Sequence, residues 1–363
     1  MPQPAQQVRF CTSRDGTRIA YAISGTGPPL VWAANWLNHL KLDWNSPVWH
    51  PWLSLLTRHH TLIHYNMRGC GLSDREQVEF SFEKFVEDLE AVIDAANLDK
   101  FVLFGRATGS AIGMTYAVRH PERVSHLVLY ASFVRNRLAG SPTPQEEAEA
   151  QARLKVIELG WPNETLAYGQ FFTSLHMPDA TPEQFRSYND LLRLTTSPEN
   201  AIALLQAFFR IDLREIVPKV RCPTLVLHCR GDSIIPFEQG RSVAGLIAGA
   251  RFVPLESRGH VLLDTEPAWH QFVDALDDFL PVPAIMVAST PGFALEKLTA
   301  REHEVLELVA QGLDNTGIAV RLGISNRTAR NHVSALLSKL GIGTRAQAIV
   351  RARECGFGLG NKR

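Results

Sequence analysis

The chain has 363 residues, of which 45% are apolar and 20% are charged. This composition is typical of a globular protein with two or three domains, and it excludes a disordered, collagen-like or disulfide-stapled chain. The 37 Lys and Arg residues balance 37 Asp and Glu residues, so no net charge attracts nucleic acid or a membrane surface. However, residues 321–353 contain seven Lys or Arg and no Asp or Glu. A small basic module therefore follows a larger acidic one.

The sequence carries no sign of a metal site or of export. Its five cysteines are scattered and form no C-x-x-C pair, and His59, His60 and His64 do not have the spacing of metal ligands. The N-terminus lacks the basic and apolar regions of a signal peptide, and no apolar run reaches the ~18 residues of a membrane helix. We therefore expect a cytoplasmic protein with no metal, no cofactor and no membrane partner.

The first 130 residues alternate apolar, β-branched runs with amphipathic stretches, which predicts an α/β fold with a parallel sheet. Strands are expected at 17–23, 29–32, 61–65, 101–104 and 124–130. Helices are expected at 82–96, with Ser81 as the N-cap, and at 111–119. The run at 124–130 is almost continuously apolar, as in a strand that is covered on both faces.

The strand pattern stops between residues 133 and 216, where amphipathic helices are expected at 144–159, 182–194 and 198–209. It then resumes with strands at 224–228 and 251–255 and helices at 237–246 and 267–280. An all-helical insertion between two stretches of sheet is the layout of a lid over an α/β core. The first domain is thus expected at 1–280, with its lid at about 133–216. Residues 281–296 contain three prolines and one glycine, which predicts a linker.

The segment after the linker has the pattern of a helix-turn-helix domain. Thr299 and Glu302 form a capping box at the start of its first helix. Gly323 supplies a tight turn, and Ser325 or Asn326 caps the helix that follows. The motifs LTAREHEVLELVAQGLDN (298–315), IAVRLGIS (318–325), RTARNHVSALLSKLG (327–341) and TRAQAIVRAR (344–353) resemble the DNA-binding domain of LuxR-type (GerE-like) transcription regulators. The resemblance implies an all-α, four-helix domain at 297–363.

In a helix-turn-helix domain the N-terminal half of the second helix enters the major groove. Arg330 and Asn331 are the candidates for base contacts, because Arg pairs with guanine and Asn with adenine. Phosphate contacts are expected from Thr316, Arg327, Thr328, His332 and Lys339. The resemblance further implies that the helix at 345–354 pairs two subunits on a two-fold operator. The expected partners are therefore double-stranded DNA, a second copy of the chain and RNA polymerase. The alternative is a solvated basic helix in a protein-interaction bundle.

Residues 8–280 resemble the α/β-hydrolase fold. HYNMRGCGLSD (64–74) matches the segment after the family's fourth strand, with Asn66 where Asp is usual. HPERVSHLVLY (120–130) matches the helix and strand that follow the nucleophile elbow. CPTLVLHCRGDSIIP (222–236) places Asp232 in the loop of the catalytic acid, and SRGHVLLDTEP (257–267) places His260 at the position of the base. The order elbow, Asp, His agrees with the family.

The elbow itself departs from the family pattern G-x-S-x-G. Strand 101–104 is followed by Gly-Arg-Ala-Thr-Gly at 105–109, so that Ala107 occupies the apex where the nucleophile belongs. Without a hydroxyl or thiol at the apex no acyl-enzyme forms, and Thr108 and Ser110 are displaced from it. We therefore expect no catalytic residues but a degenerate triad of Ala107, Asp232 and His260. The residues expected to bind a ligand are Asn35, Trp36, Arg106, Ala107, Thr108, Asp232 and His260. A set of aromatic residues fits either an apolar pocket or the core: Trp36, His39, Trp44, Trp49, Trp161, Phe171 and Phe172.

Three explanations of Ala107 remain open at this stage: loss of catalysis in favour of ligand binding, engineered replacement of a serine, and base chemistry by His260 and Asp232 without a nucleophile. The first predicts a ligand-responsive transcription regulator that binds a small, apolar, carbonyl-containing effector. The second predicts a DNA-tethered hydrolase that consumes its own inducer. A hydrolase fold that merely dimerises is the third functional hypothesis.

Overall fold

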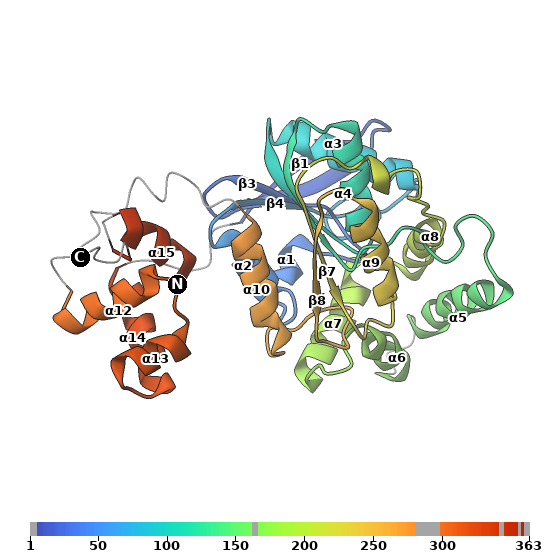
Figure 1. Cartoon of the computed structure of the whole chain (residues 1–363). Helices are drawn as coiled ribbons and strands as arrows, with labels where there is room; N and C mark the ends of the chain where they lie inside the picture. The colour runs from blue at the N-terminus through green and yellow to red at the C-terminus, as the bar shows by residue number, and fades with distance from the viewer. Residues whose placement is uncertain (1–5, 162–165, 281–297, 341–344, 355–356, 359–363) are drawn as a thin grey trace. The chain divides into compact units, whose positions relative to one another are not determined.

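The computed structural model describes residues 6–161, 166–280, 298–340, 345–354 and 357–358 (Figure 1). The expected linker at 281–296 lies outside these residues. The chain divides into two compact units, Met1–Pro281 and Val282–Arg363. None of the described helices is long and apolar enough to cross a membrane.

The first unit is built on an eight-stranded sheet with the order β1-β2-β4-β3-β5-β6-β7-β8. All neighbours from β4 to β8 pair in parallel, whereas β2 is antiparallel to both β1 and β4. The strands are β1 (Gln7–Thr12), β2 (Arg18–Ser24), β3 (Pro29–Trp32), β4 (Thr61–Tyr65), β5 (Phe101–Arg106), β6 (Val124–Tyr130), β7 (Thr224–Cys229) and β8 (Arg251–Leu255). The expectation of a parallel α/β sheet is thus confirmed for the centre of the sheet and wrong for β2.

Two layers of helices cover this sheet. On one side α3 (Phe82–Ala95) packs on α4 (Thr108–Arg119), which follows β5 directly. Elsewhere α2 (His50–Thr57) and α10 (Ala268–Phe279) lie side by side (Figure 1), where Trp52 contacts Phe272 at a ring-centroid distance of 4.7 Å. α9 (Phe237–Leu246) packs against β7 and β8. Because the sheet is covered on both faces, every residue of β5 and of β7 is buried.

The helical insertion lies between β6 and β7, as expected from the sequence. It consists of α5 (Pro144–Gly160), α6 (Leu166–His176), α7 (Pro182–Thr195) and α8 (Pro198–Phe209). Three of its helices, α5, α7 and α8, begin at side-chain caps: Thr143 and Thr181 form capping boxes, and Ser197 accepts a hydrogen bond from the Asn200 amide. The Leu175 carbonyl accepts a hydrogen bond from Ser233, which follows β7. The insertion therefore reaches the carboxyl ends of the strands, where sites of α/β folds lie.

The second unit has four described helices: α12 (Ala300–Ala310), α13 (Asn315–Leu322), α14 (Asn326–Lys339) and α15 (Arg345–Glu354). The predicted capping box of Thr299 and Glu302 is present, and Gly323 ends α13 with a φ of 65°. Val333 and Leu336 on α14 and Leu340 directly after it are buried and pack with the other helices. This core fixes the helix-turn-helix geometry of α13 and α14.

Candidate functional site

The turn between β5 and α4 has the strained geometry of a nucleophile elbow. Ala107 has a φ of 47° and a ψ of −115°, a backbone conformation that costs about 1–3 kcal/mol for a residue other than glycine. A Cβ at Gly105 would lie 2.5 Å from the Gly109 carbonyl oxygen, and a Cβ at Gly109 would lie 2.6 Å from the Ala33 carbonyl oxygen. Only glycine fits at these two positions. The strained turn is therefore present, with a methyl group at its apex.

The neighbouring hydroxyl groups do not replace the missing nucleophile. Ser110 donates its hydroxyl hydrogen to the carbonyls of Gly105 (2.8 Å) and Tyr130 (3.1 Å) and is fully buried. Thr108 is the first residue of α4 and is also buried. Its amide belongs to the unpaired N–H groups at a helix start, which is where the family's oxyanion hole takes one of its donors.

The histidine and the aspartate of the expected triad form a buried pair. His260 Nδ1 lies 2.8 Å from Asp232 Oδ2, and Asp232 Oδ1 accepts hydrogen bonds from the amides of Ile234 (2.8 Å) and Ile235 (3.0 Å). Burial opposes the ionisation of Asp232, but the attraction and hydrogen bond of His260 outweigh it, so the pKa of Asp232 lies below its usual value. This arrangement orients the His260 ring and leaves Nε2 as its atom for proton transfer.

Residues of the lid contact both the dyad and the loop after β3. The rings of His176 and His260 are 5.5 Å apart, and burial lowers the pKa of His176 to about 3, so this histidine is neutral. The ring of Trp36 lies 6.0 Å from those of Phe172 and Phe208. The lid therefore places aromatic side chains against the loop after β3 and against His260.

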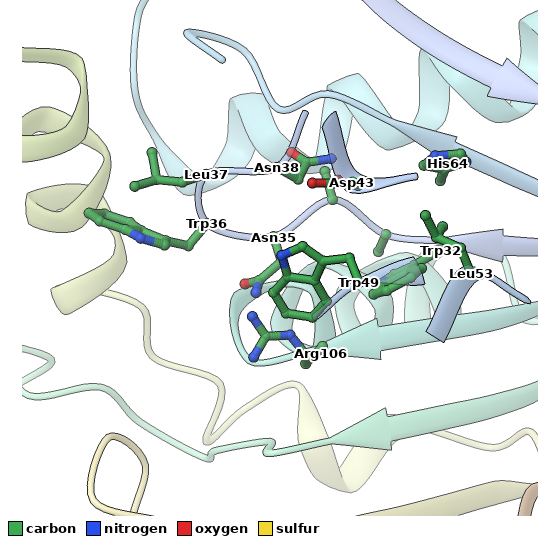
Figure 2. Close-up of a pocket in the computed structure, with 12 residues that line it drawn as sticks. Trp32, Asn35, Trp36, Leu37, Asn38, Asp43, Trp49, Leu53, His64 and Arg106 are labelled. Atoms are coloured by element: carbon green, nitrogen blue, oxygen red, sulfur yellow. The ribbon is translucent and has the colours of Figure 1, made fainter. Parts of the chain in front are cut away.

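A pocket lies beside the elbow, between β3, β4, α1 (Leu40–Asp43) and the start of α2. Figure 2 shows the Arg106 side chain, from the end of β5, next to Trp49 and Asn35. The guanidinium carbon of Arg106 is 4.8 Å from the centre of the Trp49 ring. The pocket is lined by Trp32, Ala33, Ala34, Asn35, Trp36, Leu37, Asn38, Asp43, Trp49, Leu53, His64 and Arg106.

Several polar atoms of this pocket are buried without a hydrogen-bond partner among the described residues. They are Arg106 Nη1, Asn35 Oδ1, Trp36 Nε1, Asp43 Oδ1 and both ring nitrogens of His64. Burial raises the pKa of Asp43 to about 8 and lowers that of His64 to about 4, so both are predominantly neutral at pH 7. Unsatisfied buried polar groups are costly and rare in native proteins. Six such atoms in one pocket make it the candidate ligand site.

The structure divides the residues expected to bind a ligand into two groups. Asn35, Trp36 and Arg106 line the pocket, whereas Ala107, Thr108, Asp232 and His260 belong to the elbow and the dyad. Sequence reasoning missed Asp43 and treated His64 only as an unsuitable metal ligand. No sequence signal marks either one, because each reaches the pocket through the packing of a separate element. Phe171 is 53% exposed, so it belongs neither to the pocket nor to the core. Among the described residues no cluster suited to a metal ion is present.

The second unit exposes most of the side chains that are expected to contact DNA from the start of α14. Arg327, Arg330 and Asn331 are exposed on the first turns of α14, and His332 is half-buried. Ser325 caps α14 by accepting a hydrogen bond from the Thr328 amide at 3.1 Å. The DNA contacts of these residues stay predictions.

Three of the expected phosphate contacts have partners within the unit. Asn326 donates to Thr316 Oγ1 at 2.9 Å, and the hydroxyl groups of Thr328 and Ser325 are 2.8 Å apart. Lys339 Nζ lies 2.7 Å from Glu302 Oε2, so a phosphate has to compete with this ion pair. Their phosphate contacts likewise stay predictions.

Comparison with known proteins agrees with this geometry. The profile of the family described as "alpha/beta hydrolase fold" matches residues 36–267, which is more than half of the chain. The chain belongs to the α/β-hydrolase fold family. In addition, the profile described as "Bacterial regulatory proteins, luxR family" matches residues 296–352. A LuxR-type DNA-binding domain is thus joined to a hydrolase-fold domain in one chain.

The hydrolase-fold unit also has individual relatives. The AB hydrolase superfamily protein YisY of Bacillus subtilis is 27% identical over 241 residues, covering 65% of this chain and 86% of that protein. Pyrrolizixenacetamide deacetylase of Xenorhabdus hominickii is 25% identical over 263 residues, covering 72% and 94%. Two solved structures share the fold: an esterase of Exiguobacterium antarcticum (TM-score 0.63, 24% identity, 75% of this chain and 99% of that one) and an enol-lactonase of Burkholderia xenovorans (0.60, 22%, 75% and 99%).

Proposed function

We propose that this protein is a transcription regulator whose hydrolase-fold unit binds a small effector instead of hydrolysing it. The observation that carries the proposal is the methyl group of Ala107 at the apex of an otherwise intact elbow. Acyl transfer needs a nucleophile at that position, because the elbow directs only the apex residue into the site. The fold is therefore kept while the covalent step is lost.

The pocket beside the elbow supports the ligand-binding half of the proposal. Its tryptophans supply apolar surface, and its unpaired polar atoms supply orientation, which is the usual composition of a small-molecule site. The LuxR-type domain supplies the output on DNA. A ligand alters that output only if it binds two arrangements of the protein with different affinity. In this proposal the protein works in the cytoplasm, as a homodimer on a two-fold operator.

A second candidate function rests on the His260–Asp232 pair. Its 2.8 Å hydrogen bond has the geometry of a working acid–base dyad. Base catalysis without a covalent intermediate would make the protein an enzyme attached to a DNA-binding domain. If Ala107 had replaced a serine by engineering, the unaltered protein would instead be a DNA-tethered hydrolase that consumes its own inducer.

Extraction of the purified, full-length protein separates these candidates. Native mass spectrometry before and after denaturing extraction should reveal a bound small molecule that leaves the protein chemically unchanged. Added back at a hundred times its dissociation constant, it should stabilise the protein by about 2.7 kcal/mol. Conversion of that molecule, or turnover of p-nitrophenyl acetate above the buffer rate, would contradict a purely sensory role and favour the enzyme.

A further inference from the structure

Arg106 is a buried arginine without a countercharge in contact. Arg106 is 2% exposed, and no carboxylate among the described residues forms an ion pair with its guanidinium. Burial lowers the pKa of Arg106 below its usual value, but an arginine keeps its charge in proteins. Burial of this charge without a partner is therefore unfavourable. Its contact with the Trp49 ring recovers only part of that cost.

The same unit contains a buried arginine that shows the ordinary solution. Arg68 is fully buried, and it lies 2.6 Å from an oxygen of Asp88 and 2.7 Å from an oxygen of Asp15. Two carboxylates thus neutralise and orient its guanidinium. Arg106 differs from Arg68 in this respect and in its position, since it lines the pocket beside the elbow.

The charged and titratable groups around Arg106 do not supply the missing carboxylate near neutral pH. Asp43 is predominantly protonated, because burial raises its pKa to about 8. Asp232 is engaged by His260 and two backbone amides. The phenols of Tyr130 and Tyr188 are neutral, since burial raises the pKa of both, for Tyr188 to about 12. The guanidinium therefore faces the pocket as an unpaired cation.

We propose that the effector is a hydrophobic carboxylic acid whose carboxylate pairs with Arg106. This inference rests on the proposed function and names the chemical class of its ligand. The planar guanidinium matches the two oxygens of a carboxylate, and the start of the twelve-residue helix α4 adds a favourable dipole directly after Arg106. Trp32, Trp36 and Trp49 would contact the apolar body of the acid. The ligand supplies the countercharge that Asp88 and Asp15 supply to Arg68.

The test compares acids with their neutral isosteres on the full-length protein. Phenylacetate, cinnamate and octanoate are titrated against wild type, each beside its primary amide and at constant ionic strength. Binding is followed by tryptophan fluorescence, because three tryptophans line the pocket, and by the thermal midpoint. At least one acid should bind more tightly than its amide, and Arg106→Met should weaken that acid at least about 30-fold. Arg106→Lys, which keeps the charge but loses the planar fork, should have intermediate affinity.

Stability measurements distinguish this ligand role from a structural one. Arg106→Met removes an unpaired buried charge, so its thermal midpoint without ligand should equal or exceed that of wild type. The matched control Arg68→Met leaves the buried carboxylate of Asp88 without its cation and should lower the midpoint clearly. A large loss of stability in Arg106→Met would show that the arginine serves the fold, which would overturn the proposal.

Each remaining outcome also decides the question. Amides that bind as tightly as acids, acids that bind Arg106→Met as tightly as wild type, or no acid that binds at all would overturn the anionic effector. A neutral molecule that changes operator affinity would overturn it too, while leaving the regulatory function intact. Conversely, acids that bind through Arg106 without any effect on operator affinity would uphold the assignment of Arg106 as a carboxylate-binding residue and contradict the proposed regulation.

Discussion

Replacing Asp43 by asparagine should change how the stability of the hydrolase-fold unit depends on pH. Asp43 lines the pocket and is buried, and this burial raises its pKa from 3.8 to about 8. The folded state therefore binds more protons than the unfolded state between about pH 4 and pH 8. Across that range the contribution of Asp43 to the free energy of unfolding falls as the pH rises.

The size of this effect follows from the pKa difference. One pKa unit corresponds to about 1.36 kcal/mol, so the penalty for keeping Asp43 buried reaches roughly 4 kcal/mol at pH 7. Asparagine is neutral at every pH, and its side-chain oxygen is able to accept the hydrogen bond that the His39 amide donates to Asp43. Asp43→Asn should thus match wild type near pH 4 and exceed it at pH 7.5. For a unit of this size the gain in thermal midpoint is on the order of 10 °C.

The assay is thermal unfolding of the full-length protein between pH 4 and pH 8.5, followed by tryptophan fluorescence. Asp99 lies exposed at the surface, so Asp99→Asn serves as the control and should keep the wild-type pH profile. Parallel profiles for wild type and Asp43→Asn would refute the reasoning, because they would show that Asp43 is ionised in the folded protein. Arg106 would then have a negatively charged neighbour at neutral pH.

Four further variants test the elbow and the DNA interface. Ala107→Ser should gain weak, His260-dependent hydrolysis of p-nitrophenyl acetate over an inactive wild type, whereas no gain would indicate that the oxyanion loop is also lost. Gly109→Ala should destabilise the first unit by about 1–3 kcal/mol in urea unfolding, since its Cβ would lie 2.6 Å from the Ala33 carbonyl oxygen; unchanged stability would contradict the steric argument. Arg330→Ala should cost about 1–3 kcal/mol of discrimination between operator and random DNA. By contrast, Lys339→Ala should weaken both equally and reduce the salt slope by about one unit, and equal behaviour of the two variants would contradict their assignments.

The strands that were located best from the sequence are those with short, mostly apolar runs. The expected bounds 29–32, 61–65, 124–130 and 251–255 are those of β3, β4, β6 and β8. By contrast, β1 was missed because its residues alternate between exposed and half-buried at the edge of the sheet, so little apolar periodicity marks it. The helices α1, α2 and α6 were missed as well. The first two are short and lie among tryptophans and a proline, which obscure a helical repeat.

The elbow was recognisable from sequence because its chemistry is local. Two glycines at a fixed spacing after an apolar strand predict the turn, and the apex residue follows by position. Even there, α4 was expected to begin at 111 and begins at Thr108, because the strained turn starts the helix without a preferred N-cap residue. The pocket was only partly predictable. Asn35, Trp36 and Arg106 flank recognisable motifs, whereas Asp43 and His64 join them only through tertiary packing.

The remaining prediction concerns the coupling between the two units, which the proposed function requires. The stretch 321–353 carries seven positive charges in a chain of zero net charge, so the rest of the chain carries about seven negative ones. Attraction between the two parts would favour an arrangement that masks Arg327 and Arg330. DNA would favour the other arrangement, in which the α14 helices of two subunits lie one turn of the DNA helix apart, about 34 Å.

A ligand that binds these arrangements with different affinity must change operator affinity, typically by 1–3 kcal/mol or about 5- to 150-fold. Linkage then requires that operator DNA change the affinity for the ligand by the same factor and in the same direction. The ligand is titrated by tryptophan fluorescence with and without saturating operator, and operator is titrated with and without saturating ligand. Random DNA of equal length is the control for non-specific charge effects. Equal factors in the two titrations support coupling of either sign, since activation and repression obey the same cycle. Identical ligand affinities with and without operator would show that the pocket does not regulate DNA binding.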